Sequence, residues 1–227
     1  DFIFGNSNLK TVSIDNYDAR LEYYFNNGDN FSISPFFKNF TNHIELVNTN
    51  QGFTWQNVDK STVRGIEVEG RKKISKNFDF LGNVTLVKSQ TEFVLYRLEV
   101  QDGLKNYVPI DTTERTMFGQ APFVVNGIIN YTADSIGLSI ALSYNIQGKK
   151  LVFTSTDGTP DIFEMPRHNL DLKISKKLGK HFNVSLKVQN ILDESTRRSY
   201  IYDNDDTLDH DRYTYGTTYT LGFSYKL

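Results

Sequence analysis

The sequence predicts an all-β fold, an antiparallel up-and-down transmembrane β-barrel, and three observations lead to this prediction. Apolar and polar residues alternate along many segments, which gives a strand one apolar and one polar face. These segments are longer than ordinary strands, and the connections between them alternate between tight turns and long links. No segment shows the apolar spacing of a helix, so we expect the chain to be built from strands.

Nine segments carry the alternation. Each has at least the ~9–11 residues that a tilted strand needs to cross a bilayer. Strands of soluble proteins average only ~5–6 residues, so the length of these segments favours a membrane protein. The predicted strands are 14–26, 30–46, 53–74, 78–93, 119–133, 136–148, 166–178, 181–191 and 215–227.

The connections predict the topology. Tight turns rich in Gly, Asn, Asp and Ser alternate with longer links, as in outer-membrane barrels with short periplasmic turns and long extracellular loops. A Greek-key sandwich has no reason to produce this order. The tight turns are Asn26–Asp29, Ser75–Asn77, Ala133–Ser135 and Leu178–His181, and the long links are 48–52, 95–118, 150–165 and 193–214.

The last strand shows the two faces most clearly. Tyr219, Leu221 and Phe223 alternate with Thr220 and Gly222. Aromatic residues gather near the tight turns, where rings at one level form an interfacial girdle in a membrane barrel. Pro35 removes one backbone donor inside its strand, so we expect a bulge or a later strand start there. The girdle residues are Tyr23, Phe25, Phe31, Phe78, Phe80, Tyr131, Phe182 and Tyr225.

Composition excludes several classes of protein. The 227 residues suit one large domain or two small ones, and 25 basic against 27 acidic residues do not indicate a nucleic-acid partner. The absence of cysteine excludes a disulfide framework and thiol chemistry. The first ten residues lack the features of a signal peptide, and no run of 18 apolar residues occurs. Because the chain starts without Met and in mid-pattern, we expect residues 1–227 to be the C-terminal part of a longer barrel domain.

Successive blocks of the sequence resemble one family. The segments NLKTVSIDNYDARLEYYFNNGDNFSISPFFKNFTNHIE, STVRGIEVEGRKKIS, GQAPFVVNGIINY, PRHNLDLKISKKLGKHFNVSLKVQNILDE and YTLGFSYKL follow one another in order. They resemble the last strands of TonB-dependent outer-membrane receptors, in a style closest to Bacteroidetes-type bacteria. The resemblance implies about nine of about twenty-two strands, with the plug and the earlier strands outside this sequence.

The resemblance also implies location and partners. The outer membrane of a Gram-negative bacterium would supply the lipid, and the barrel assembly machinery would insert the chain. An inner-membrane energising complex would act through a plug and N-terminal segment, and a surface lipoprotein is a further candidate partner. The C-terminus resembles the assembly signal, although the family often ends on an aromatic residue and this chain ends on Leu. The signal positions are Thr220, Gly222, Tyr225 and Leu227.

Polar residues at the alternate strand positions that face away from the apolar side are candidates to line the lumen. Glu67 and Glu69 face the same way with Arg71 and Lys73 next to them. Paired carboxylates can act as acid and base on glycosides, but a compensated charge ladder along the lumen is the preferred interpretation. The lumen-facing candidates are Arg20, Glu22, Glu67, Glu69, Asp171, Lys173 and Lys187.

The loop DNDDTLDHD is the candidate site for substrate. Its dense carboxylates can bind Ca²⁺, but the glycine turn and final glutamate of an EF-hand are missing, and a solvated loop is preferred. The scattered histidines suit no metal site, and no nucleophile or phosphate motif occurs, so we expect no enzyme activity, no metal and no cofactor. The substrate-contact candidates are Arg197, Arg198, Tyr200, Tyr202, Asp203, Asp205, Asp206, Asp209 and Asp211.

The expected function follows from the resemblance. A TonB-dependent transporter takes up a scarce siderophore, cobalamin, peptide or glycan with energy from the inner membrane. A passive porin or structural barrel is the first alternative, and a soluble carbohydrate-binding β-domain is the second.

Overall fold

A computed structural model describes residues 3–49, 52–101, 104–155, 160–202 and 206–226. In these residues sixteen strands form one curved sheet, accompanied by a single 3-10 turn, η1 (Asp134–Ile136). The all-β prediction is therefore confirmed. None of the described helices has the length and apolar character needed to cross a membrane.

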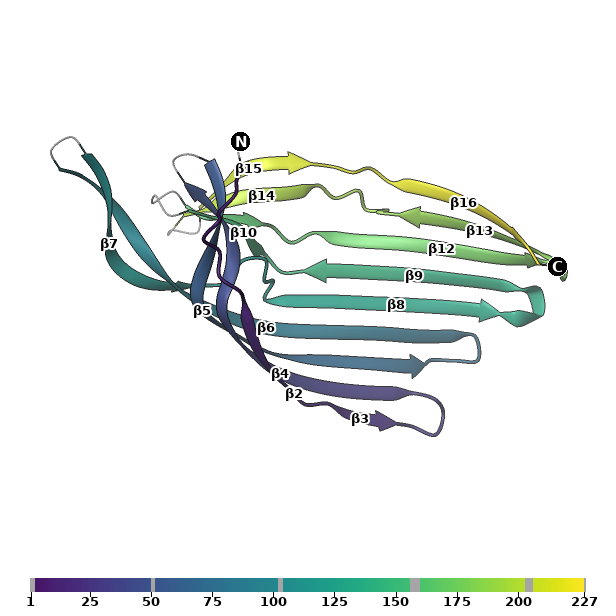
Figure 1. Cartoon of the computed structure of the whole chain (residues 1–227). Coiled ribbons are helices and arrows are strands. Elements are labelled where there is room, and N and C mark those ends of the chain that lie inside the picture. Colours follow the sequence, from purple (N-terminus) through teal and green to yellow (C-terminus); the bar gives the residue numbers. More distant parts are fainter. Residues whose placement is uncertain (1–2, 50–51, 102–103, 156–159, 203–205, 227) are drawn as a thin grey trace.

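The centre of the sheet is an antiparallel meander, β4-β5-β6-β8-β9-β12-β13-β16, with β2 and β3 paired to the outer edge of β4 (Figure 1). Each of the nine predicted segments forms strand, and neighbouring segments pair as an up-and-down sheet. The bounds are β2 (Ser13–Asp18), β3 (Leu21–Tyr24), β4 (Asn30–Thr49), β5 (Gly52–Lys73), β6 (Phe78–Gln101), β8 (Phe123–Ala133), β9 (Leu138–Gln147), β12 (His168–Leu178), β13 (Phe182–Gln189) and β16 (Thr218–Tyr225).

The first predicted segment is divided opposite Pro35. β4 itself runs through this proline without a break or a register shift, so the bulge or later strand start expected there is wrong. β2 pairs with β4 up to Phe36 and β3 pairs from Ile33, so the ladder is interrupted opposite the proline. Pro35 has no N–H to donate, and its carbonyl still accepts from the N–H of Ala19 at 3.2 Å. The lost donor therefore divides the strand without shifting its register.

The predicted long links contain further strands, which differs from the sequence prediction. The link at 48–52 is short, because β4 ends at Thr49 and β5 starts at Gly52, so the expected strict alternation of short and long connections is wrong there. Most of 95–118 continues β6 into a projecting hairpin with β7 (Figure 1). The remaining strands are β1 (Ile3–Phe4), β7 (Leu104–Arg115), β10 (Lys150–Ser155), β11 (Ile162–Glu164), β14 (Thr196–Ile201) and β15 (Thr207–Tyr213).

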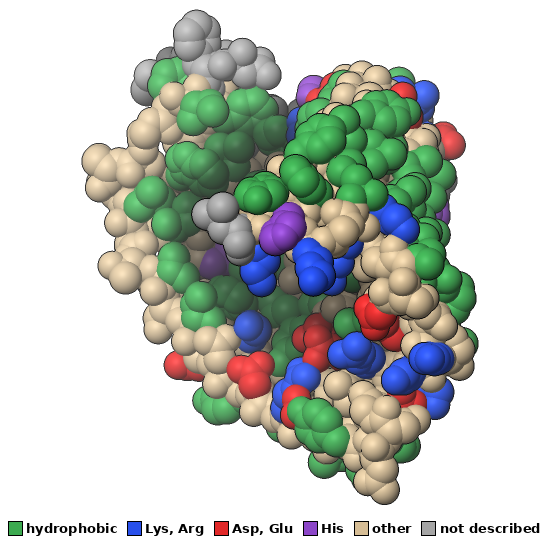
Figure 2. Space-filling view, turned by 90° about the vertical axis from the view of Figure 1, so that its right-hand side faces the viewer, with side chains coloured by type: hydrophobic (Ala, Val, Ile, Leu, Met, Phe, Trp, Pro, Cys, Tyr) green, Lys and Arg blue, Asp and Glu red, His purple; other side chains and the backbone are tan. Residues whose placement is uncertain are grey.

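Four of these strands form a small sheet at the end with the long links. β15, β14, β11 and β10 lie side by side, and β10 runs parallel to the end of β4, with Thr154 opposite Val47. β16 and the β2/β3 pair do not meet in the described residues, so the meander stays open. Viewed from the tight turns, the molecule is hollowed as a trough (Figure 2).

The meander has no ordinary core. Its apolar side chains alternate with polar ones and stay exposed, with Tyr219 at 71% and Phe223 at 75%. Predicted girdle rings pair near the tight turns: Phe78 lies 4.8 Å from Tyr131, and Phe182 lies 5.0 Å from Tyr225, between ring centroids. A wall between lipid and a polar lumen needs these two faces, whereas a soluble sheet would bury one.

Candidate functional site

A row of polar residues crosses the inner face of the meander from strand to strand. Each member is the direct register partner of the next, so their side chains stand side by side. We call this the polar row, and its members are Glu22, Ser32, Glu69, Asn83, Asn126, Asn145 and Asn169.

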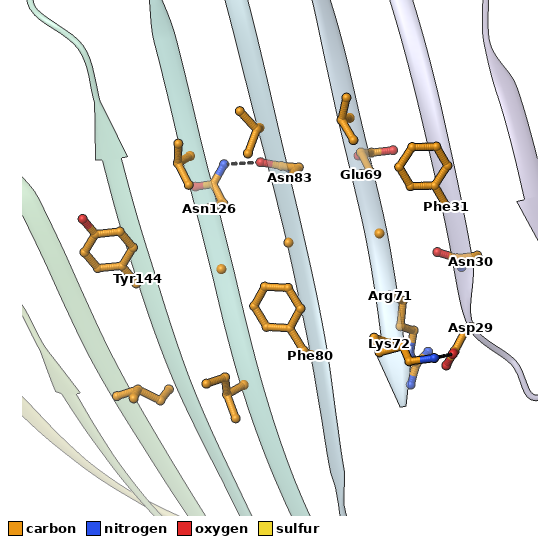
Figure 3. Close-up of a pocket in the computed structure, with 18 of the residues that line it drawn as sticks. Asp29, Asn30, Phe31, Glu69, Arg71, Lys72, Phe80, Asn83, Asn126 and Tyr144 are labelled. Carbon is orange, nitrogen blue, oxygen red and sulfur yellow. Dashed lines mark hydrogen bonds and ion pairs between the residues drawn. The ribbon is translucent and has the colours of Figure 1, made fainter. Parts of the chain in front are cut away.

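Asparagines form the central part of the polar row. The Asn126 amide donates to the Asn83 oxygen at 2.7 Å, and the Asn145 amide donates to the Asn126 oxygen at 2.6 Å. The first of these bonds is drawn in Figure 3. Asn126 uses one donor and its acceptor within the row, Asn83 only accepts and Asn145 only donates, so each amide keeps further groups for water or a bound surface. The row can therefore bind a polar protein surface or line an aqueous path.

Arg20 lies at the first end of the polar row and joins three strands. Its guanidinium donates to Glu22, to Glu69 Oε2 at 2.6 Å and to Ser34 Oγ at 3.3 Å. These side chains are about 36–45% exposed, so solvent weakens the pairing. Three lumen-facing candidates from the sequence are thus brought together, and Glu69 is compensated across strands by Arg20, whereas the prediction named Arg71 and Lys73.

The other lumen-facing candidates are spread along the same face. Glu67 precedes Glu69 by two residues, and Asp171 accepts a hydrogen bond from the backbone N–H of Asn190 at 2.8 Å. Lys173 and Lys187 are direct register partners on β12 and β13. Two cations placed opposite each other repel, so this position favours an anionic group on whatever occupies the trough.

At the other end of the molecule, Arg198 is the centre of an aromatic and acidic cluster. Its guanidinium lies 5.8 Å from the ring centroid of Phe153 and 5.7 Å from that of Tyr213. The guanidinium forms ion pairs with the carboxylates of Asp211, at 3.4 Å, and Glu164, at 3.8 Å. The cluster can stack a planar ligand, although its positive charge is already balanced.

The remaining substrate-contact candidates surround this cluster. Arg197 lies 3.7 Å from Asp209, which Arg212 also contacts at 3.1 Å, and the Tyr200 hydroxyl lies 3.2 Å from His210 Nδ1. Asp206 accepts from the N–H of Tyr202 at 3.0 Å through its backbone, whereas Asp203 and Asp205 lie outside the described residues. Within the described part of the chain, no group of three or more acidic or histidine side chains is arranged to hold a metal ion.

A buried ionic network, which the sequence did not predict, joins β4 to the end of β7 and to β5. Glu45 has no solvent exposure and binds Arg115, the N–H of Phe118 at 3.1 Å and His43 Nε2 at 2.9 Å. His43 Nδ1 continues to Ser61 at 3.1 Å. His43 and Glu45, at alternate positions of one strand, were the available sequence signal for a polar cluster. Their partner Arg115 could not be identified, because it is distant in sequence.

The predicted assembly signal lies on the edge strand. Thr220 and Gly222 face the trough from β16, and Tyr225 packs on Phe182 with the girdle. A Cβ at Gly222 would lie 2.7 Å from Ser185 Oγ, so a side chain there would require Ser185 to move. Leu227 lies outside the described residues. The role of these positions in assembly stays a prediction.

Comparison with known proteins places this geometry in a family. Residues 1–191 match the family model described as "TonB dependent receptor-like, beta-barrel". The chain belongs to the TonB-dependent receptor β-barrel family. A search of curated proteins finds no match for the sequence.

Solved receptors of this family share the fold at low identity. The ferric enterobactin receptor of Pseudomonas aeruginosa is 16% identical over 99% of this chain and 33% of its own, with a TM-score of 0.62. A copper transporter is 11% identical over 97% of this chain and 32% of its own, with a TM-score of 0.64. The pyoverdine outer membrane receptor of P. aeruginosa is 13% identical over 96% of this chain and 30% of its own, with a TM-score of 0.60. This chain spans about a third of the length of these receptors.

Proposed function

We propose that this chain is the C-terminal wall of a TonB-dependent transporter in the outer membrane of a Gram-negative, Bacteroidetes-type bacterium, and that it has no enzyme activity. The observation that carries the proposal is the open meander with one exposed apolar face and one continuous polar row, in a chain that belongs to this family. The polar row would contact a plug supplied by the longer protein, and an inner-membrane energising complex would move that plug. Barrel assembly machinery and a surface lipoprotein complete the proposed partners.

The substrate would bind at the end with the small sheet. Structural relatives include receptors for iron chelates and a copper transporter, which favours a scarce metal or its chelate as cargo. Arg198 with Phe153 and Tyr213 would stack a planar, polar group of such a ligand. Arg197, Tyr200 and Tyr202 would extend the contact.

The test is growth and uptake in a strain that lacks the full-length gene. We expect slower growth of this strain on one scarce nutrient, and the wild-type gene should restore growth. Uptake of that nutrient by the complemented strain should stop when the inner-membrane proton gradient is dissipated. Uptake that survives this treatment would favour the passive porin. Recovery of the whole protein in the soluble fraction without detergent would favour the carbohydrate-binding β-domain.

A further inference from the structure

A shallow apolar groove lies on the face of the meander opposite the polar row. Its volume is about 760 Å³, and it crosses β4, β5, β6, β8, β9 and β12. Figure 3 shows the ring of Phe80 between Phe31 on one side and Tyr144 on the other. Val68, Ile129 and Leu142 are among the other apolar residues that line it.

Three glycines in register create the groove. Gly70 pairs with Gly82, and Gly82 pairs with Gly127, so three neighbouring strands present no side chain at one level. Phe80 covers part of this floor, because a Cβ at Gly82 would lie 2.8 Å from its ring. Glycine weakens a strand and often marks the close approach of another group. Three in a row on a lipid-facing surface therefore indicate an occupant.

One end of the groove is cationic. Asp29 and Lys72 line this end, 2.6 Å apart, and the Lys72 side chain remains 66% exposed. β5 ends here in the segment RKKISK, which supplies Arg71, Lys72, Lys73 and Lys76. Asp29 and Asp79 are the carboxylates that contact these cations. Lysine and arginine gather on this end of the molecule (Figure 2), which leaves it net positive.

We propose that the groove binds an acyl chain of an anionic glycerophospholipid of the periplasmic leaflet, with its phosphate near Lys72 and Lys76. This inference rests on the proposed outer-membrane placement, in which tight turns face the periplasm. An acyl chain suits the groove because the backbone groups beneath it are already paired in the sheet, so it offers a peptide no hydrogen bonds. The cationic end stands at the level of the headgroups, where basic residues attract anionic lipid.

The groove can be filled without disturbing the sheet. At Gly70 the nearest atom to a new Cβ is a backbone oxygen at 3.6 Å, and at Gly127 it is the Phe80 ring at 3.5 Å. Neither glycine has a positive φ. Gly70→Leu and Gly127→Leu therefore add volume inside the groove while improving strand propensity. Val184→Leu is the matched control, because it enlarges a lipid-facing residue of β13 outside the groove.

The experiment uses the full-length receptor, extracted from outer membranes in mild detergent and titrated with dioleoylphosphatidylglycerol under native mass spectrometry. We expect the wild type and Val184→Leu to retain one phospholipid, and Gly70→Leu or Gly127→Leu to bind it at least tenfold more weakly. The double variant Lys72→Gln, Lys76→Gln should lose on the order of fivefold per lysine in preference for phosphatidylglycerol over phosphatidylethanolamine.

Two results overturn the site. If Gly70→Leu binds phospholipid like the wild type, the groove is not the phospholipid-binding site. If the receptor retains lipopolysaccharide in place of phospholipid, this surface belongs to the other leaflet. A receptor that inserts and transports but retains no phospholipid contradicts this site alone. A receptor absent from outer membranes contradicts the proposed function as well.

Discussion

Next to the tight turns, the meander keeps one unbroken register, whereas beyond Asn42 of β4 the strands bend and are joined by strands from distant links (Figure 1). In the described residues, register shifts occur only in the outer part, in β6–β7, β10–β11 and β14–β15. Buried side chains also concentrate there, among them Glu45, Leu151 and Ser199.

The difference teaches that two kinds of interaction specify the two regions. In the inner region every strand has an apolar and a polar face, so alternation excludes a slip by one residue and the tight turns select the register. In the outer region, which the proposed placement puts beyond the membrane, particular buried contacts such as Glu45 with Arg115 hold the strands together. Substitutions should therefore act differently in the two regions.

The largest effect is expected at the buried network of the outer region. Glu45→Ala leaves the Arg115 guanidinium, only 12% exposed, without its carboxylate, which should cost about 3–5 kcal/mol of local stability. Amide hydrogen exchange of β4, β7 and β10 measures this loss. Glu114→Ala is the control: it removes an exposed neighbour and should change stability by less than about 0.5 kcal/mol. Equal effects would show that the network does not hold the outer region.

In the inner region, the face of the substitution should decide its cost. Val184→Arg places a charge on the lipid-facing side of β13 and should destabilise by about 2–4 kcal/mol. Ser185→Arg, one residue further, points into the trough and should be tolerated. Denaturant unfolding in lipid vesicles measures both. Similar values at the two positions would refute the assignment of faces.

The regular part of this comparison could be predicted from sequence, because its determinants are local. All nine segments form strands, and strand parity places Phe223 and Thr220 on opposite faces of the sheet. The bulge or later start expected at Pro35 is wrong, because β4 continues through the proline and the partner strand is divided instead. The polar row could not be recognised, because Asn83, Asn126 and Asn145 become neighbours only when the register of three strands is known.

The outer region could not be predicted for the same physical reason. β10 pairs with β4 through residues far apart in sequence, and nothing local indicates that Thr154 meets Val47. Arg197 and Arg198 were expected to contact a ligand, and the fold pairs them with Asp209 and Asp211, which the sequence did not indicate. Their role in substrate contact stays a prediction.

A moderate effect is expected in the polar row. Asn126→Ala removes hydrogen bonds to Asn83 and Asn145, each worth about 1 kcal/mol. Because these amides are half-buried, the loss should appear in unfolding of the inner region and leave hydrogen exchange in the outer region unchanged. Asn183→Ala, on the same face but outside the row, is the control and should cost less. An equal cost would mean that the row adds nothing to ordinary strand pairing.

The smallest effect is expected at the first tight turn. Hydrogen bonds from Lys72 and from the N–H of Lys73 lower the pKa of Asp29 from 3.8 to about 2. A carboxyl whose pKa is lowered by folding adds stability above pH 3.8, and this contribution is lost as the pH falls towards 2. Thermal unfolding between these pH values should show the loss in the wild type and less of it in Lys72→Met. The same pH dependence in both proteins would exclude the pair as its cause.

The central claim is that the two faces of the meander meet lipid and water. Residues 1–227 contain no cysteine, so single cysteines carrying spin labels can be placed along β16 from Tyr219 to Phe223 in the full-length receptor, with every cysteine outside these residues replaced by serine. We predict that labels at 219, 221 and 223 collide with oxygen dissolved in the bilayer, and that labels at 220 and 222 collide with a water-soluble nickel complex. Accessibility without this period of two, or with the opposite phase, would contradict the account.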